Sequence, residues 1–63
     1  MNSADIKAAL GPVRVKRCWT SFRVCTLDGS PVAPFVPAAE ALGFRVFVNQ
    51  AHEAFLYPQP RDR

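Results

Sequence analysis

A chain of 63 residues can build only one hydrophobic core, and this limit constrains the fold more than any motif does. A domain of this size buries only about 60% of the surface that its unfolded chain exposes. Its core rarely supplies more than about 3–5 kcal/mol, so small domains often add disulfides, a metal or a second subunit. We therefore expect one domain over residues 1–63 that depends on one of these aids.

The residues that form disulfides and metal sites are few. The cysteines are Cys18 and Cys25, and the one histidine is His52. They form no Cys-x-x-Cys or His-x-x-x-His pair, so we expect neither a metal nor a cofactor. A Cys18–Cys25 bridge stays open on sequence grounds, with reduced thiols favoured. Oligomerisation is the remaining aid, and we expect a homodimer.

Composition predicts a folded cytoplasmic protein. Hydrophobic residues make up 49% of the chain and charged residues 21%, unlike the profile of disordered chains. No apolar run approaches the ~20 residues that cross a bilayer, and Asp5 and Lys7 stand where a signal peptide would be apolar. We expect no membrane partner, and a flexible tail over the polar, proline-broken residues 58–63.

The first third of the chain predicts a helix followed by a strand hairpin. Ser3 suits a helix N-cap and Gly11-Pro12 ends the segment, which predicts a helix over Ser3–Leu10. The apolar period then changes to two, and a reversal near Thr20-Ser21 would separate apolar from basic side chains. In this hairpin Trp19 meets Phe22 and Arg17 meets Val24. One face then carries Val13, Val15, Trp19, Phe22 and Val24, and the other carries Arg14, Lys16, Cys18, Arg23, Cys25 and Leu27. A single bulged strand is the alternative.

The rest of the chain predicts further strands around a second helix. The Asp-Gly pair within Leu27–Ser30 predicts another hairpin, leading to Val32–Val36 as an edge strand or an extended loop. Pro37–Leu42, followed by Gly43, predicts a short helix. Phe44–Val48 and Ala54–Tyr57 predict a final hairpin. Both faces of Phe44–Val48 are apolar, as in a central strand or one covered by a partner. The fold class is thus α+β, in the order α-β-β-(β)-α-β-β with an antiparallel sheet of four to five strands.

Motifs for catalysis are absent from the sequence. It contains no Walker loop, dinucleotide-binding glycine motif or zinc signature. His52 and Glu53 are neighbours in a predicted turn, but adjacent extended residues point to opposite faces. Neither cysteine has a base or an oxyanion hole at a recognisable spacing. We expect that the protein is not an enzyme.

The segment Val13–Cys25 is the most informative for function, because it holds four of the eight basic residues together with Trp19 and Phe22. We expect a non-catalytic interaction protein, of the regulator or inhibitor type, that binds a protein partner through its surface. The alternative is a nucleic-acid-binding module that uses the basic strand face. The expected contact residues are Arg14, Lys16, Arg17, Arg23, Phe47 and Tyr57.

Overall fold

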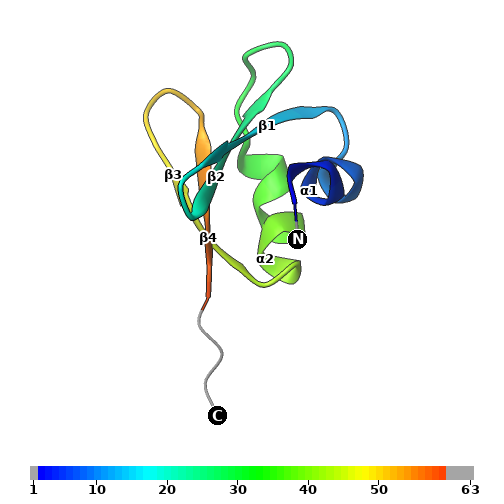
Figure 1. Ribbon diagram of the computed structural model, residues 1–63. Coiled ribbons are helices and arrows are strands. Elements are labelled where there is room, and N and C mark those ends of the chain that lie inside the picture. The colour runs from blue at the N-terminus through cyan, green and yellow to red at the C-terminus, as the bar shows by residue number, and fades with distance from the viewer. Residues whose placement is uncertain (1, 60–63) are drawn as a thin grey trace.

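One four-stranded antiparallel sheet and two helices make up the computed structural model, which describes residues 2–59 (Figure 1). The elements are α1 (Ser3–Leu10), β1 (Val13–Cys18), β2 (Ser21–Thr26), the 3₁₀ helix η1 (Ala33–Phe35), α2 (Val36–Ala41), β3 (Phe44–Val48) and β4 (Ala54–Pro58). The strand order is β1-β2-β4-β3, and all neighbours are antiparallel. The protein is a mixed α+β domain, as predicted, and its sheet has four strands, the lower of the two predicted numbers.

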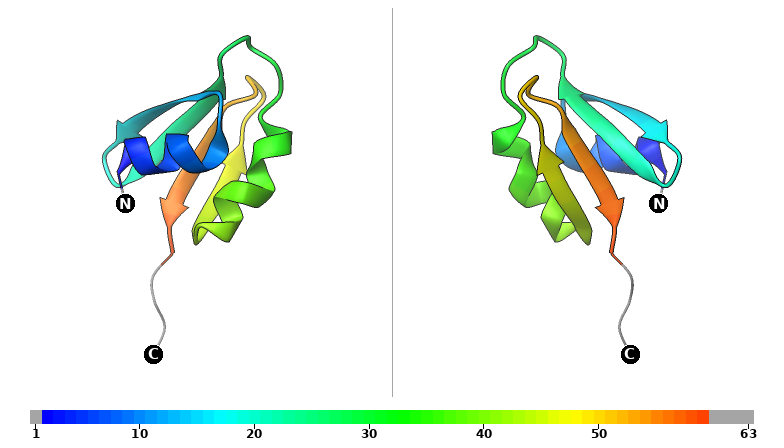
Figure 2. Two further views of the ribbon diagram at one scale, coloured as in Figure 1. Left: turned by 90° about the vertical axis from the view of Figure 1, so that its right-hand side faces the viewer. Right: turned by 90° about the vertical axis from the view of Figure 1, so that its left-hand side faces the viewer.

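Both helices lie on the same face of the sheet (Figure 2). α1 packs against β1, α2 packs against β3, and the two helices touch each other. The core between the layers consists of Ile6, Leu10, Val13, Phe22, Val24, Val32, Ala39, Phe44, Ala54 and Leu56. Phe22 and Phe44 meet edge to face in it, with ring centroids 6.0 Å apart. None of the helices described within residues 2–59 is both long enough and apolar enough to cross a membrane.

α1 has the predicted bounds but a different N-cap. Asn2 caps the helix in place of Ser3: its side chain accepts from the Asp5 N–H at 2.9 Å, and the Asp5 carboxylate accepts from the Asn2 N–H at 3.4 Å. This reciprocal pair is a capping box. At the other end Gly11, at φ 102°, donates its N–H to the Lys7 carbonyl over 2.9 Å. The positive φ explains why glycine ends the helix.

The first hairpin reverses as predicted but turns one residue earlier. Cys18 faces Ser21 and Val15 faces Val24, so the two turn residues are Trp19 and Thr20. The pairing is shifted by two residues from the predicted register, and a two-residue shift leaves each strand residue on its predicted face. The bulged-strand alternative is wrong, since the two strands pair side by side.

Three residues lie elsewhere than the predicted hairpin placed them. Trp19 is wrong as a core residue, because it stands in the turn with 94% of its surface exposed. Arg17 faces Phe22 rather than Val24. Leu27 follows the end of β2 and lies exposed in the next turn rather than on the basic face of the strand.

The predicted hairpin at Asp28-Gly29 is wrong, although the turn itself is present. Both the N–H and the hydroxyl of Ser30 donate to one carboxylate oxygen of Asp28, at 3.0 and 2.7 Å. The chain then enters η1 and α2 instead of a fifth strand. Pro34 lies in the first turn of η1, where its fixed φ suits a helix start as well as an extended edge. Val32 is buried and Phe35 packs against the core.

The second hairpin, β3 with β4, is confirmed; of the two alternatives for β3, the central position is wrong and cover by a partner stays a prediction. β3 is an edge strand, and the central strands are β2 and β4. The turn is held by Asn49, whose side-chain oxygen accepts from the N–H groups of Ala51 and Glu53 at 2.9 and 3.0 Å. Of the predicted tail, Pro58 belongs to β4, and residues 60–63 lie outside the described residues.

Candidate functional site

The sheet face opposite the helices is covered by no other described element (Figure 2). Side chains alternate between the two faces of the sheet along each strand, so every second residue lies on this uncovered face and the residues between them point toward the helices. We call this surface the open face. Its side chains are Arg14, Lys16, Cys18, Ser21, Arg23, Cys25, Arg45, Phe47, Phe55 and Tyr57. It therefore gathers basic and aromatic residues from all four strands.

One row of side chains crosses the whole open face. Lys16 pairs with Arg23, Arg23 with Phe55, and Phe55 with Phe47. Adjacent strands lie about 4.8 Å apart, so the row spans roughly 14 Å from β1 to β3. The cations occupy β1 and β2, whereas the aromatic rings occupy β4 and β3. The open face thus has a basic half and an aromatic half that share the same row.

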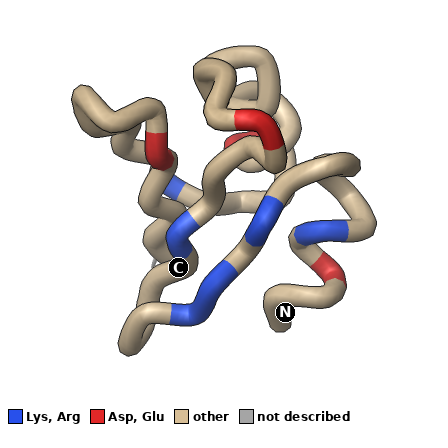
Figure 3. The backbone as a smooth tube through the Cα atoms, turned by 90° about the horizontal axis from the view of Figure 1, so that it is seen from above, with Lys and Arg blue, Asp and Glu red and all other residues tan. Residues whose placement is uncertain are grey.

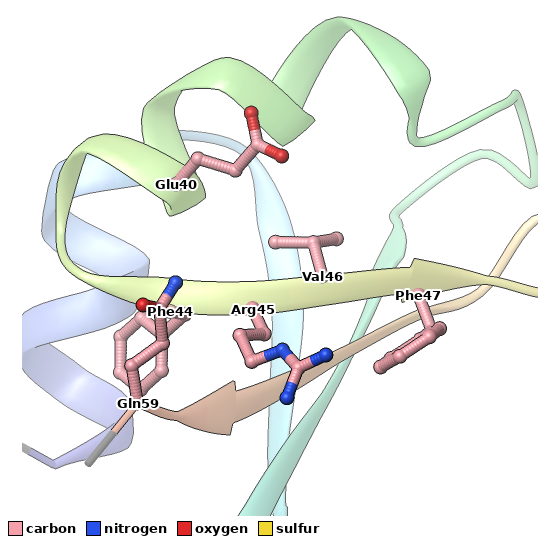
Figure 4. A pocket seen from close by; sticks show the side chains of 6 residues that line it. All are labelled: Glu40, Phe44, Arg45, Val46, Phe47 and Gln59. Atoms are coloured by element: carbon pink, nitrogen blue, oxygen red, sulfur yellow. The ribbon is translucent and has the colours of Figure 1, made fainter.

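The aromatic half is built around Phe47 and Tyr57. Their rings meet edge to face with centroids 5.6 Å apart, yet 55% of Phe47 and 40% of Tyr57 stay exposed. Arg45 lies opposite Tyr57, and these three residues with Pro58 line a shallow hollow of about 420 Å³. Figure 4 shows Arg45 and Phe47 on the opposite side of β3 from Val46, whose side chain points toward α2. Flat rings are therefore presented beside a guanidinium group.

The basic half follows β1 and β2, as the positions of lysine and arginine along the backbone show (Figure 3). The acidic side chains of the described residues lie in the helices and turns instead. The nearest is Glu53, whose Oε2 is 4.0 Å from the Arg23 Nε. Both side chains are partly exposed and this distance is long, so the pair is weak and leaves Arg23 available to an anion.

Five of the predicted contact residues lie together on this surface: Arg14, Lys16, Arg23, Phe47 and Tyr57. Arg17 does not, because it has the opposite parity on β1. It lies beside the hairpin tip, where its Nε donates to the Trp19 carbonyl over 3.2 Å. Sequence reasoning missed Phe55 and Arg45, although the period of two relates Phe55 to Tyr57 and Arg45 to Phe47.

Residues considered for other chemistry lie apart from one another. His52 is exposed in the turn before β4, at φ 62°. Within residues 2–59 no three His, Cys, Asp or Glu side chains come together as metal ligands. Cys25 faces Arg14, four residues along β1 from Cys18, which separates the two cysteines by about 13 Å. That is too far for the Cys18–Cys25 bridge that the sequence left open.

Comparison of the chain with models of protein families, with curated proteins and with solved structures finds no match.

Proposed function

We propose that the protein is a non-catalytic binding domain whose open face binds single-stranded nucleic acid. The observation that carries this proposal is the placement of the basic and aromatic residues on the same uncovered sheet face. Basic grooves that follow the phosphates and aromatic rings that stack on bases are the two components of single-strand recognition. The open face offers both, in adjacent halves.

The division of the open face into a basic half and an aromatic half suggests how a nucleic-acid strand would lie on it. Arg14 and Lys16 stand two residues apart on β1, with Arg23 beside Lys16 on β2. These cations would bind successive phosphates, while unstacked bases would reach Phe47 and Tyr57 in the aromatic half. Base stacking on an aromatic side chain is worth about 1–3 kcal/mol and tolerates any base. We therefore expect binding with little sequence preference.

The sequence favours a protein partner, for which the protein would act as a regulator or an inhibitor. The charge of the open face makes nucleic acid the better candidate: it carries Arg14, Lys16, Arg23 and Arg45, with Glu53 as the neighbouring acid. Nucleic-acid interfaces are much more positively charged than protein interfaces, and the open face has four cations beside one acid. A protein partner is the outcome that remains if nucleic acid does not bind.

The test is a titration of labelled single-stranded RNA and DNA oligonucleotides, followed by fluorescence anisotropy at several salt concentrations. Each phosphate contact contributes about −0.7 to the slope of log K against log salt. The three cations of the basic half predict a slope of about −2. Arg23→Gln should lower the magnitude of that slope by about 0.7 and weaken binding to every sequence.

Lys7→Gln is the matched control, because it removes the same charge from α1 on the covered side of the sheet. It should leave both the affinity and the slope nearly unchanged. Absence of binding at low salt and about 100 μM protein, the weak end of non-specific affinity, would overturn the proposal. So would equal effects of Arg23→Gln and Lys7→Gln.

Two further properties belong to the proposal. A homodimer would form along β3, because the edge strand β1 carries three cations that repel a second copy, whereas Val48 stands exposed on β3, away from the open face. Such a dimer leaves the open face free for a ligand. A cytoplasmic location is supported by the two unpaired thiols.

A further inference from the structure

Trp19 is the one large apolar side chain of the described chain that the fold leaves almost entirely in solvent. Its exposed fraction is 94%, and it stands at the tip of the β1–β2 hairpin. Its φ of 58° is in the left-handed region, which disfavours bulky residues. Glycine, asparagine or aspartate would make this turn at lower cost. Neither packing nor turn geometry accounts for an indole here.

Trp19 adjoins the end of the open face, and one cation, Arg17, lies beside it. It directly follows Cys18, at the end of the strand that presents Arg14 and Lys16. Its carbonyl accepts from the Arg17 Nε, which holds that guanidinium at the tip and leaves its other N–H donors for an anion.

The tip also lies at the same end of the sheet as the aromatic half. β2 runs antiparallel to β4 with Phe22 opposite Leu56, so continuing the register brings the start of β2 beside Tyr57. Trp19 extends from β1 beyond that end. A nucleic-acid strand stacked on Tyr57 would therefore pass Ser21 and Cys18, at the edge of the basic half, before it meets the indole.

We propose that Trp19 is a further stacking residue for the same bound strand, and that Arg17 binds the phosphate next to the stacked base. This inference rests on the proposed function and adds a second contact region to it. An indole and a guanidinium side by side match a base and its phosphate, because the base offers an aromatic face and the phosphate accepts charge-assisted hydrogen bonds. The strained, exposed position keeps the ring free to stack.

The chain contains one tryptophan, so its fluorescence reports on Trp19 alone. Titration with unlabelled single-stranded oligonucleotides should quench this fluorescence, with the Kd that anisotropy gives for the same oligonucleotide. Trp19→Ala should weaken binding about 5- to 150-fold, the loss expected for one stacked base. Trp19→Phe should recover part of the affinity.

Leu27→Ala is the matched control, since Leu27 is the exposed apolar residue of another turn. Its affinity should equal that of the unchanged protein. Circular dichroism of all three variants should be superimposable, because both side chains lie outside the core.

The outcomes separate this inference from the proposed function. If the oligonucleotide binds by anisotropy but Trp19 fluorescence stays constant and Trp19→Ala binds equally well, the role of Trp19 is wrong and the open face stands. If no oligonucleotide binds, both proposals are wrong. If vesicles containing phosphatidylserine shift the fluorescence and oligonucleotides do not, the tip binds a lipid surface and the inference is overturned.

Discussion

Leu56 and its neighbours on β4 illustrate how successive residues of one strand point to opposite sides of the sheet. Leu56 is wholly buried between the sheet and the helices, whereas Phe55 and Tyr57 point to the open face. The period of two in AFLY predicts this division. It does not tell which side faces the helices, because both sides carry apolar side chains.

Leu56→Ala should lower the free energy of unfolding by about 2–5 kcal/mol, since it removes buried methyl groups and leaves a cavity. Urea denaturation followed by circular dichroism measures this loss. Leu27→Ala deletes the same atoms from an exposed side chain and should change stability by less than about 0.5 kcal/mol. Similar losses in the two variants would contradict the assignment of Leu56 to the core.

The ionisation of one carboxylate, that of Asp28, makes the stability of the protein depend on pH. The hydroxyl and the N–H of Ser30 donate to it, and these hydrogen bonds hold its pKa below the ordinary value of 3.8. A depressed pKa in the folded state stabilises the protein at pH values above 3.8, and this stabilisation is lost as the pH falls through the folded-state pKa. Below that pKa the extra stabilisation that the ionised carboxylate gives to the turn is absent.

Asp28→Asn should therefore lose less stability between pH 7 and pH 3 than the unchanged protein does. Denaturant titrations at the two pH values give the comparison, and the other carboxylates cancel because both proteins carry them. An Asp28 pKa at or above 3.8 in an NMR titration would contradict the hydrogen bonds described for the turn.

At the scale of elements, local sequence rules predicted most of the helices and strands. They failed where the same residues suit two different secondary structures. α1 and β3 have the predicted bounds, and β4 extends one residue beyond its predicted end, because caps, glycines and β-branched runs act locally. The segment from Ala33 to Val36 is helical because Pro34 fits a helix start as well as an edge strand. The first turn was displaced by one residue because Trp19 lacks any turn preference.

Trp19→Gly should raise the free energy of unfolding by roughly 0.5–1 kcal/mol, because glycine adopts a positive φ without the strain that tryptophan bears. The same variant should lose binding, so stability and affinity should move in opposite directions. Thr20→Gly is the control: Thr20 has no positive φ, and glycine there should only destabilise. A loss of stability in Trp19→Gly would show that the indole supports the fold.

At the scale of the whole molecule, the strand order determines which side chains share one surface. The sequence places cations on one face of β1–β2 and aromatic residues on both faces of β3. It does not reveal that the two hairpins join through β2 and β4, because that pairing links residues far apart in the chain. The joining creates the open face and leaves β3 at an edge. Five of the candidate residues were therefore predictable, but Phe55, Arg45 and the surface that they share with those five were not.

Val48→Lys should convert the proposed homodimer to a monomer, because a lysine on an exposed edge opposes strand pairing. Gel filtration over a dilution series measures the change, and oligonucleotide affinity should persist since the open face is intact. A single monomer-sized peak for the unchanged protein at every concentration would contradict the dimer.

The most direct test of the central claim is an NMR titration of ¹⁵N-labelled protein with a single-stranded oligonucleotide. Amide shift changes should gather on the strands of the open face, around Arg23, Phe47 and Tyr57, and should spare α1 and α2. Changes that gather on the helices instead, or no changes at ligand excess and low salt, would contradict binding of nucleic acid by the open face.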